Sequence, residues 1–448
     1  MTRSLKQRAA HSGKWVIAGH FTSQLLRLGS NLVLTRLLVP EMFGVMAMVT
    51  VIMGGLAMFS DVGLLQNIVQ SKRGEEKDYL NTAWTIQIIR GFVIFLIALA
   101  LSYGLYLSGQ YGLLSSDTVY GNVDLPLILA IVSISAIIAS FNSIHILVLN
   151  RKLMMSKLII IDLLSQIIGL IFMLIWAWFH RDIWALVFGG ILGALVKMLL
   201  THTLNIGEPC KFRWDKDAVG DIFHFGKWIF LSSIFGFLLN QGDRILLGGL
   251  ISPEMLGVYT VAFFLANALK DIITKLISSV FYPVLSETLR NSPENLESTY
   301  YKIRNKIDAI AFFSAGFIFA SGEAIVSILY DSRYQDAGWM LQVLSLSLIG
   351  AGSLLASQYF LSRGKPKLET LLVFVQVTYF YLVMPVLFYF YGITGSVIAI
   401  ASYPILRLFL SMFLMKKFFF FNLNKELIML PLIAIGFWIG NIVANIII

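Results

Sequence analysis

The sequence has little charge for its length. Of its 448 residues only 13% are Asp, Glu, Lys or Arg, whereas 58% are hydrophobic. A soluble domain carries about 25% charged residues, so the composition excludes a water-soluble fold and a disordered chain. The single cysteine, Cys210, excludes a secreted scaffold held by disulfides. The composition also argues against a nucleic-acid-binding module, in spite of a net charge of +9.

Long apolar runs are what the sequence has in abundance. A bilayer-spanning helix needs roughly 20 apolar residues, and thirteen such runs occur. They are continuous rather than alternating in polarity, so they predict helices and not the strands of a β-barrel. The predicted spans are residues 14–38, 42–68, 80–107, 124–149, 158–179, 183–205, 222–250, 255–285, 303–330, 337–361, 368–390, 393–415 and 425–447.

The basic residues between the spans predict an orientation. Of the 34 Lys and Arg residues, 23 lie in the N-terminal tail and in every second connection. The connections of the opposite set hold only Arg181 and Arg333. Since cytoplasmic connections carry an excess of Lys and Arg, we expect the N-terminus in the cytoplasm.

The sequence contains an internal repeat. Residues 13–45 and 226–258 align without a gap at an offset of 213, and thirteen of the 33 aligned positions are identical. Both copies share the turn Pro-Glu-Met-x-Gly-Val, which begins at Pro40 and again at Pro253. Proline fits the first turn of a helix and glutamate favours its positive end, so the turns are interpreted as helix starts.

The repeat predicts the domain organisation. Six spans separate its two copies, and because six is even, both halves point the same way through the membrane. We therefore predict two six-helix lobes related by a pseudo-two-fold axis along the membrane normal, with a substrate site at their interface. The N-terminal lobe covers residues 1–205, the C-terminal lobe covers residues 206–415, and an additional transmembrane helix covers residues 416–448.

Two stretches resemble a known transporter family. Residues 34–72 contain LTRLLVPEMFGVMAMV, FSDVGL and IVQSK, and residues 240–262 read NQGDRILLGGLISPEMLGVYTVA. They resemble the polysaccharide-transporter (Wzx-type) branch of the multidrug/oligosaccharidyl-lipid/polysaccharide (MOP) exporter superfamily. The resemblance implies an all-α polytopic membrane protein whose two lobes form a V, as in the multidrug exporters (MATE) and the lipid II flippase. The family usually has 12 or 14 spans, whereas thirteen are predicted here, so either a fourteenth helix is absent or the last predicted span is wrong.

The resemblance also implies a function. Members of this family move undecaprenyl-diphosphate-linked oligosaccharides from the cytoplasmic to the periplasmic leaflet of bacterial inner membranes, which is the location that the resemblance implies for this chain. We therefore predict an alternating-access flippase for O-antigen, capsule or exopolysaccharide synthesis, not an enzyme. Its expected partners are the lipid-linked oligosaccharide, membrane lipids, and the polysaccharide polymerase and glycosyltransferases of the same pathway, and no nucleic acid. No cofactor is expected, and the candidates for a coupling ion are H⁺ and Na⁺.

Four basic residues inside the spans are candidates for binding the diphosphate. A charge at the bilayer centre costs about 2.5–3.5 kcal/mol, so it usually faces a watery cavity or a partner. Arg27 and Lys270 lie near the middle of their spans, and Arg90 and Arg407 lie slightly to the cytoplasmic side. Arginine pairs with phosphate through a planar fork and lysine acts as a point charge. The alternative is that these residues form ion pairs between helices.

Further polar residues lie on the predicted spans. Amides near the expected cleft are candidates for hydrogen bonds to sugar hydroxyls, or they bridge helices instead. These amides are Gln24, Asn31, Asn240 and Asn267. Four charged residues are candidates for ion coupling or for a gate, with a structural salt bridge as the alternative. These are Asp61, Asp243, Arg244 and Glu323.

The sequence shows no P-loop, no kinase or hydrolase signature and no His/Cys metal cluster. No catalytic residue and no metal site is therefore predicted. Among enzymes the alternative is a polysaccharide polymerase or ligase, which needs a large outer loop, whereas the longest predicted outer connection is residues 108–123. Among transporters the alternative is an ion-coupled small-molecule or multidrug antiporter of the same superfamily. A multidrug cavity favours acidic residues, whereas most of the charged residues near the middle of the predicted spans are basic.

Overall fold

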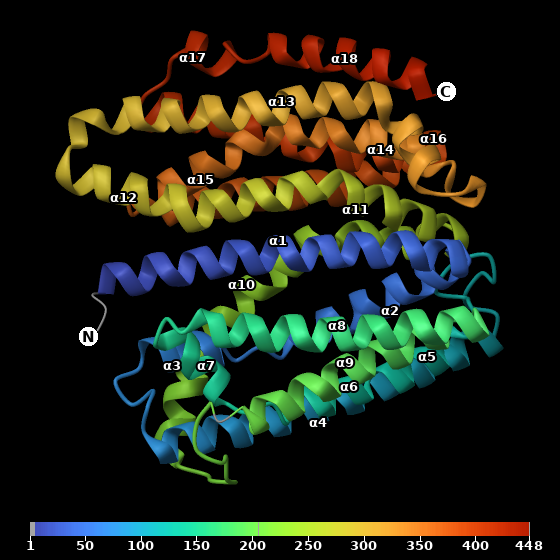
Figure 1. Ribbon diagram of the computed structural model, residues 1–448, viewed down its shortest axis with the longest axis vertical. Helices are drawn as coiled ribbons and strands as arrows, with labels where there is room; N and C mark the ends of the chain where they lie inside the picture. Colours follow the sequence, from blue (N-terminus) through green and yellow to red (C-terminus); the bar gives the residue numbers. More distant parts are fainter. Residues whose placement is uncertain (1–4, 205, 448) are drawn as a thin grey trace. The chain divides into compact units, whose positions relative to one another are not determined.

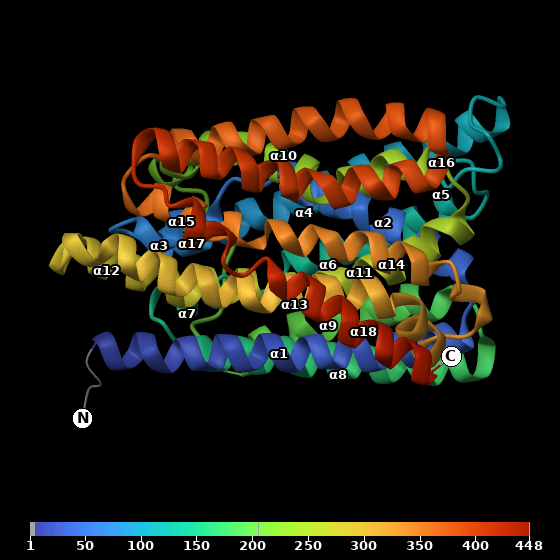
Figure 2. The same ribbon diagram turned by 90° about the horizontal axis from the view of Figure 1, so that it is seen from above.

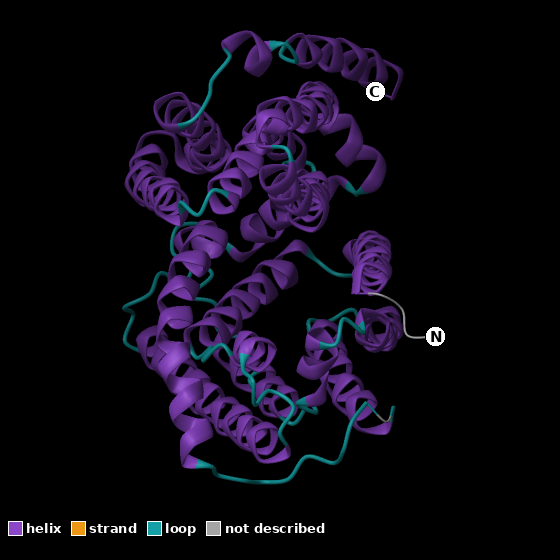
Figure 3. Ribbon diagram, turned by 90° about the vertical axis from the view of Figure 1, so that its left-hand side faces the viewer, coloured by secondary structure: helices purple, strands orange, loops and turns teal. Residues whose placement is uncertain are grey.

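The computed structural model describes residues 5–204 and 206–447, and their side chains except at 5–11, 224–232, 279, 280 and 283. The described residues form helices joined by loops and contain no β-strand (Figure 3). The all-α fold class predicted from the sequence is confirmed. The basic tail residues Arg3, Lys6 and Arg8 lie outside the described side chains.

The chain divides into two compact units, which meet in sequence at Gly257 and Val258. The first unit contains α1 (Leu5–Leu37), α2 (Pro40–Phe59), α3 (Leu64–Gln70), α4 (Lys77–Gln110), α5 (Leu125–Val132), α6 (Ile134–Ser140), α7 (His145–Arg151), α8 (Met155–His180), α9 (Trp184–Thr203), α10 (Lys216–Gly248) and the first turn of α11 (Pro253–Leu276) (Figure 1). Although the repeat assigns α10 to the second half of the chain, α10 packs in the first unit against α2, α3 and α4. The predicted lobe boundaries stay a prediction.

Glycines bring helices of the first unit close together. A Cβ atom at Gly169 on α8 would lie 2.9 Å from the carbonyl oxygen of Gly189 and 3.2 Å from the Cα of Gly193, both on α9. Such close backbone approach is typical of small residues between membrane helices. These glycines therefore let α8 and α9 pack closely.

The two turns of the sequence repeat pack against each other. Pro40 and Pro253 are the first residues of α2 and α11, as the sequence predicts. A Cβ at Gly44 would overlap the carbonyl of Pro253, and a Cβ at Gly257 would overlap the carbonyl of Pro40. The contact is thus reciprocal, which explains why both copies keep glycine at the same place in the turn.

The second unit holds the remaining helices. They are the rest of α11, a π-helical turn (Ile277–Phe281), α12 (Tyr282–Asn291), a 3₁₀ turn (Pro293–Asn295), α13 (Leu296–Leu329), η3 (Ser332–Tyr334), α14 (Ala337–Ser345), a 3₁₀ stretch (Leu346–Gly352), α15 (Ser353–Ser362), α16 (Pro366–Phe418), α17 (Leu423–Leu427) and α18 (Pro431–Ile447). Its core is formed around Tyr300 and Tyr359 by apolar and aromatic side chains of α11, α12, α13, α15 and α16 and of the π-helical turn and the 3₁₀ stretch Leu346–Gly352.

The long helix α16 turns back on itself at Gly392, as Figure 2 shows. Gly392 has φ 60° and ψ −143°, a conformation that glycine adopts without steric cost. Across the turn, Tyr379 Oη lies 3.0 Å from Ser402 Oγ, and the rings of Phe380 and Tyr403 are 6.0 Å apart. The two arms are therefore antiparallel and correspond to two predicted spans.

The additional C-terminal helix α18 packs along α13 (Figure 1). A Cβ at Gly316 would overlap the carbonyl of Ile433, and a Cβ at Gly436 would overlap the carbonyl of Phe313. Gly440 makes a similarly close approach to Phe317. The spacing of Gly436 and Gly440 is the G-x-x-x-G pattern that lets two membrane helices pack closely.

Nine helical stretches of the described residues are long and apolar enough to cross a membrane, or ten if the bent pair Leu125–Ser140 and His145–Arg151 is one span. The sequence predicts thirteen. Of the remaining predicted spans, two lie in the single long helix α16, and those on α1 and α10 are not among these stretches. Every predicted span lies on helical residues, apart from short breaks and residue 205, which is not described.

Candidate functional site

One face of α1 carries a polar stripe around Arg27. Nη1 of Arg27 lies 3.5 Å from Oε1 of Gln24, one turn earlier, and the Arg27 side chain is exposed. Asn31 follows one turn later and is half-buried, and its carbonyl accepts a 2.9 Å hydrogen bond from Thr35 Oγ1. Residues three or four apart share a helix face, so the structure places Gln24, Arg27 and Asn31 in one line.

Lys270 lies on α11 in the second unit and is half-buried. Its Nζ is 5.9 Å from the centre of the Tyr403 ring on α16. A cation–π contact uses the charge of an ammonium group but none of its N–H donors, which stay able to bind an anion. Asn267 is one turn earlier on the same helix and donates a 2.9 Å hydrogen bond to the carbonyl of Phe263.

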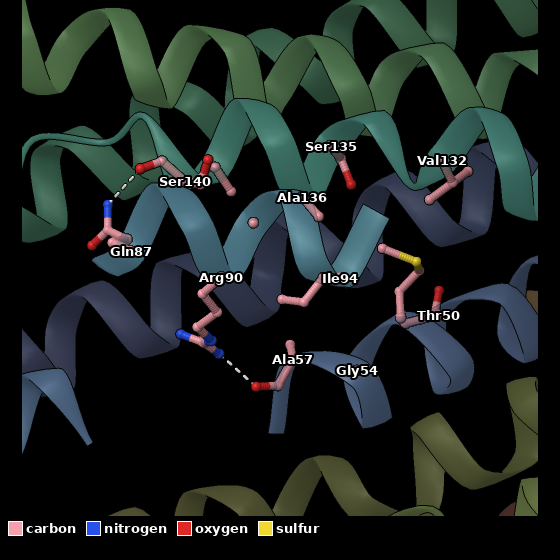
Figure 4. Close-up of a pocket in the computed structure, with 13 residues that line it drawn as sticks. Thr50, Gly54, Ala57, Gln87, Arg90, Ile94, Val132, Ser135, Ala136 and Ser140 are labelled. Atoms are coloured by element: carbon pink, nitrogen blue, oxygen red, sulfur yellow. Dashed lines mark hydrogen bonds between the residues drawn. The ribbon is translucent and has the colours of Figure 1, made fainter. Parts of the chain in front are cut away.

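Arg90 lines a cavity of about 520 Å³ inside the first unit (Figure 4). Its Nε donates to Ser60 Oγ at 3.0 Å, and its Nη2 donates to the carbonyl of Ala57. Both acceptors lie at the C-terminal end of α2, where a positive charge is favourable. Gln87, one turn before Arg90, donates to the carbonyl of Ser140 at 2.8 Å. These contacts favour the structural alternative for Arg90.

Asp61 occupies the break between α2 and α3. Its Oδ1 accepts a 2.9 Å hydrogen bond from the backbone N–H of Gly63, which has φ 65°. The side chain is half-buried and shapes the turn that ends α2. The sequence places Asp61 inside a continuous span, whereas the structure shows that the helix is interrupted there.

Arg407, on the second arm of α16, is buried against the first arm of α16 and against α15. Its Nη2 lies 2.6 Å from Glu369 Oε1 and 2.6 Å from Ser357 Oγ, and its Nη1 lies 2.7 Å from Gln376 Oε1. The side chain is only 8% exposed. This set of partners favours the interhelical ion pair over contact with a substrate.

The remaining predicted residues lie on α10 and α13. Asn240, Asp243 and Arg244 are on α10, where Asn240 donates to the carbonyl of Gly236 at 2.8 Å and Arg244 Nη1 donates to Gln241 Oε1 at 2.7 Å. Asp243 is buried. Glu323 is exposed on α13 and lines a second cavity. The assignment of these residues to substrate or ion binding stays a prediction.

Arg304, near the start of α13, is a basic residue of the predicted cytoplasmic connections that is buried instead of exposed. The side chain is 1% exposed and forms ion pairs with Asp308 at 2.6 Å and Glu426 at 3.1 Å. Tyr300 and the carbonyl of Gly352 accept further hydrogen bonds from Nη1, each at 3.2 Å. Asp308 was detectable by its i, i+4 spacing, whereas no sequence signal indicates Glu426.

Residues 33–339 match the family described as "Polysaccharide biosynthesis protein". The chain is 21% identical to the lipopolysaccharide biosynthesis protein WzxC of Escherichia coli (strain K12), covering 76% of this chain and 67% of that protein. It is 20% identical to the succinoglycan biosynthesis transport protein ExoT of Rhizobium meliloti (strain 1021), covering 70% and 61%. These matches confirm the family resemblance of the sequence.

The fold is similar to that of a solved lipid II flippase, MurJ, in an inward closed conformation. The TM-score is 0.72 at 14% identity, and the match covers 96% of this chain and 97% of that chain. At this identity the likeness shows the fold. It confirms the fold expected from the MOP resemblance.

Proposed function

Since the chain belongs to the family of polysaccharide biosynthesis proteins, we propose that it is a flippase for an undecaprenyl-diphosphate-linked oligosaccharide. It transfers the headgroup and glycan across the bacterial inner membrane by alternating access of its two lobes. The names of its relatives support transport of polysaccharide precursors, since one is a transport protein of succinoglycan biosynthesis and one fold neighbour is a lipid II flippase.

The observation that carries this proposal is the polar stripe of α1 with Arg27 at its centre. A guanidinium group near the midplane of a span is costly in lipid, so Arg27 needs a polar environment. Lys270, near the middle of α11, adds a second positive charge whose N–H donors are not used by its contact with Tyr403. Charge-assisted hydrogen bonds from Arg27 and Lys270 would hold the two phosphates, while Gln24, Asn31 and Asn267 contact the first sugars.

The lipid tail stays in the bilayer during the transfer. The sequence contains no P-loop, so the energy comes from an ion gradient or from use of the product outside. H⁺ and Na⁺ are the candidate ions, and Asp61, Asp243 and Glu323 are the candidate acids. The N-terminus is cytoplasmic, and the glycosyltransferases and polymerase of the pathway supply and consume the substrate.

A reconstituted transport assay tests this function. Vesicles containing the purified protein receive a polyprenyl-diphosphate saccharide, and an impermeant reagent measures how much of it reaches the far leaflet. We expect transfer well above that in vesicles with heat-unfolded protein, and little transfer of a polyprenyl saccharide that lacks the diphosphate. Transfer at the background level would contradict the proposal. Ion-driven transport of organic cations instead would favour the antiporter.

A further inference from the structure

A second cavity, of about 620 Å³, lies in the second unit where α13 ends and α14 begins. It is lined by side chains from the end of α13, the η3 turn and the start of α14. Glu323 and Tyr330 come from the α13 side, Gln335 and Asp336 from the connection, and Trp339 from α14. Arg27, Lys270 and Arg90 do not line this cavity, and of its lining residues the proposed function uses only Glu323, as a candidate acid for ion coupling.

The walls of this cavity are held in place by close packing. A Cβ at Gly338 on α14 would lie 2.9 Å from the Cα of Glu323 on α13, so the two helices approach closely beside the cavity. Tyr330 and Tyr334 are buried, with ring centres 5.6 Å apart, and they fix the turn. Asp331 Oδ1 accepts a 3.0 Å hydrogen bond from the backbone N–H of Arg333, which caps η3. The polar side chains are therefore presented from a rigid frame.

The residue types in the cavity suit a sugar. A large pocket of this size holds a small molecule, and an indole ring offers a flat apolar face for the C–H groups of a pyranose ring. The Glu323 and Asp336 carboxylates and the Gln335 amide supply acceptors and donors for hydroxyls. No group of three His, Cys, Asp or Glu side chains within the described residues is placed to hold a metal ion, so a metal does not account for these carboxylates.

The charge of the cavity restricts the kind of sugar. Arg333 forms an ion pair with Asp331, with Nε 3.0 Å from Oδ1, so Asp331 contributes little net charge. Glu323 and Asp336 remain and make the lining negative. Like charges repel, so the cavity disfavours a phosphate or an acidic sugar and accepts a neutral or an amino sugar.

The cavity lies at the end of α13 that the charge pattern assigns to the periplasm. The opposite end of α13 carries Lys302, Arg304 and Lys306, whereas this connection carries only Arg333. We propose that this cavity is an outer-face binding site for a neutral or amino-bearing sugar of the transported glycan. The inference rests on the proposed function, because the glycan reaches this side only after transfer.

Saccharide binding to the intact protein in nanodiscs of neutral lipid tests the site. The probes are methyl glucoside, glucosamine and glucuronate, followed by saturation-transfer NMR and titration. We expect binding of glucoside and glucosamine, and at least tenfold weaker binding of glucuronate. Trp339→Ala should weaken binding about tenfold, while Trp438→Ala, at an exposed tryptophan of α18, should leave it unchanged. Equal binding of the three probes, or no effect of Trp339→Ala, would overturn the inference.

The variant Asp336→Asn tests the site without disturbing the packed core, and measurement of lipid transfer distinguishes failure of this inference from failure of the proposed function. Asp336→Asn removes one charge from an exposed loop position, so it should narrow the preference against glucuronate without altering thermal unfolding. An unchanged preference would count against the site. A protein that flips the lipid but binds no saccharide overturns this inference alone. A protein that binds saccharide in the cavity but flips no lipid overturns the proposed function and leaves the site as a sugar site.

Discussion

Replacing Arg304 by methionine should destabilise the second unit strongly. The side chain is paired with Asp308 and Glu426, and all three side chains are 1% exposed. Removing the cation leaves two buried carboxylates without their counter-charge. Breaking a buried ion pair from one side costs about 3–5 kcal/mol, and we expect Arg304→Met to lower the free energy of unfolding by that amount.

The loss of folded structure in Arg304→Met should begin at the C-terminal helices. Glu426 lies on α17, and the neighbouring Lys425 pairs with Glu297 at 3.1 Å, so these contacts tie α17 to the start of α13. In Arg304→Met the connection between α16 and α17 should therefore become sensitive to a protease before the rest of the unit. Asn422, whose backbone N–H donates to Tyr301 Oη at 3.0 Å, marks the segment to be monitored.

Unfolding of the purified protein by a denaturing detergent measures the free energy, and limited proteolysis measures the local opening. The matched control is Lys302→Met, an exposed residue of the same helix, for which we expect a change within about 0.5 kcal/mol. Combining Arg304→Met with Asp308→Leu and Glu426→Leu should restore most of the stability, since apolar residues can replace a buried ion cluster. An Arg304→Met protein as stable as the Lys302→Met control would refute this reasoning.

Two further predictions follow from other contacts. Gly44→Ala should lower the free energy of unfolding by about 1–3 kcal/mol, because the added Cβ would overlap the Pro253 carbonyl. Gly54→Ala on the same helix is the control, since its Cβ would meet open space and should leave the stability unchanged. Thermal unfolding compares the two variants, and equal stability would contradict the close contact at Gly44. The hydrogen bond from Arg73 lowers the pKa of Asp215. The ionised Asp215 carboxylate should therefore contribute fully to the stability of the protein above about pH 4, and this contribution should disappear at lower pH. Asp215→Asn should then reduce the melting temperature at pH 7 and flatten its fall on acidification, whereas parallel pH curves for the two proteins would exclude this role.

Much of the fold could be predicted because the signals are local. Apolar runs mark the helices, and Pro40 and Pro253 mark two helix starts, which the structure confirms. The reciprocal contact of Gly44 with the second turn was not predicted, because a repeat shows that two segments are alike but not that they touch.

The surroundings of the charged residues were less predictable. The position of Arg407 within a predicted span identified it as a charge that needs a partner. Its partners lie on α15 and on the first arm of α16, which only the tertiary fold brings next to Arg407. Glu323 was identified as an unusual acid in a span. Its neighbour Trp339 was not, because the cavity that joins them forms where three elements meet.

The transport rate of the double variant Arg27→Ala, Lys270→Ala tests the central claim most directly. The assay uses reconstituted vesicles and a polyprenyl-diphosphate saccharide, and it includes only protein whose thermal unfolding matches that of the wild type. If Arg27 and Lys270 hold the diphosphate, the loss of two charge-assisted contacts, each worth about 1.5–3 kcal/mol, should reduce transport at limiting substrate by at least a hundredfold. Transport at the wild-type rate by a well-folded double variant would contradict the account.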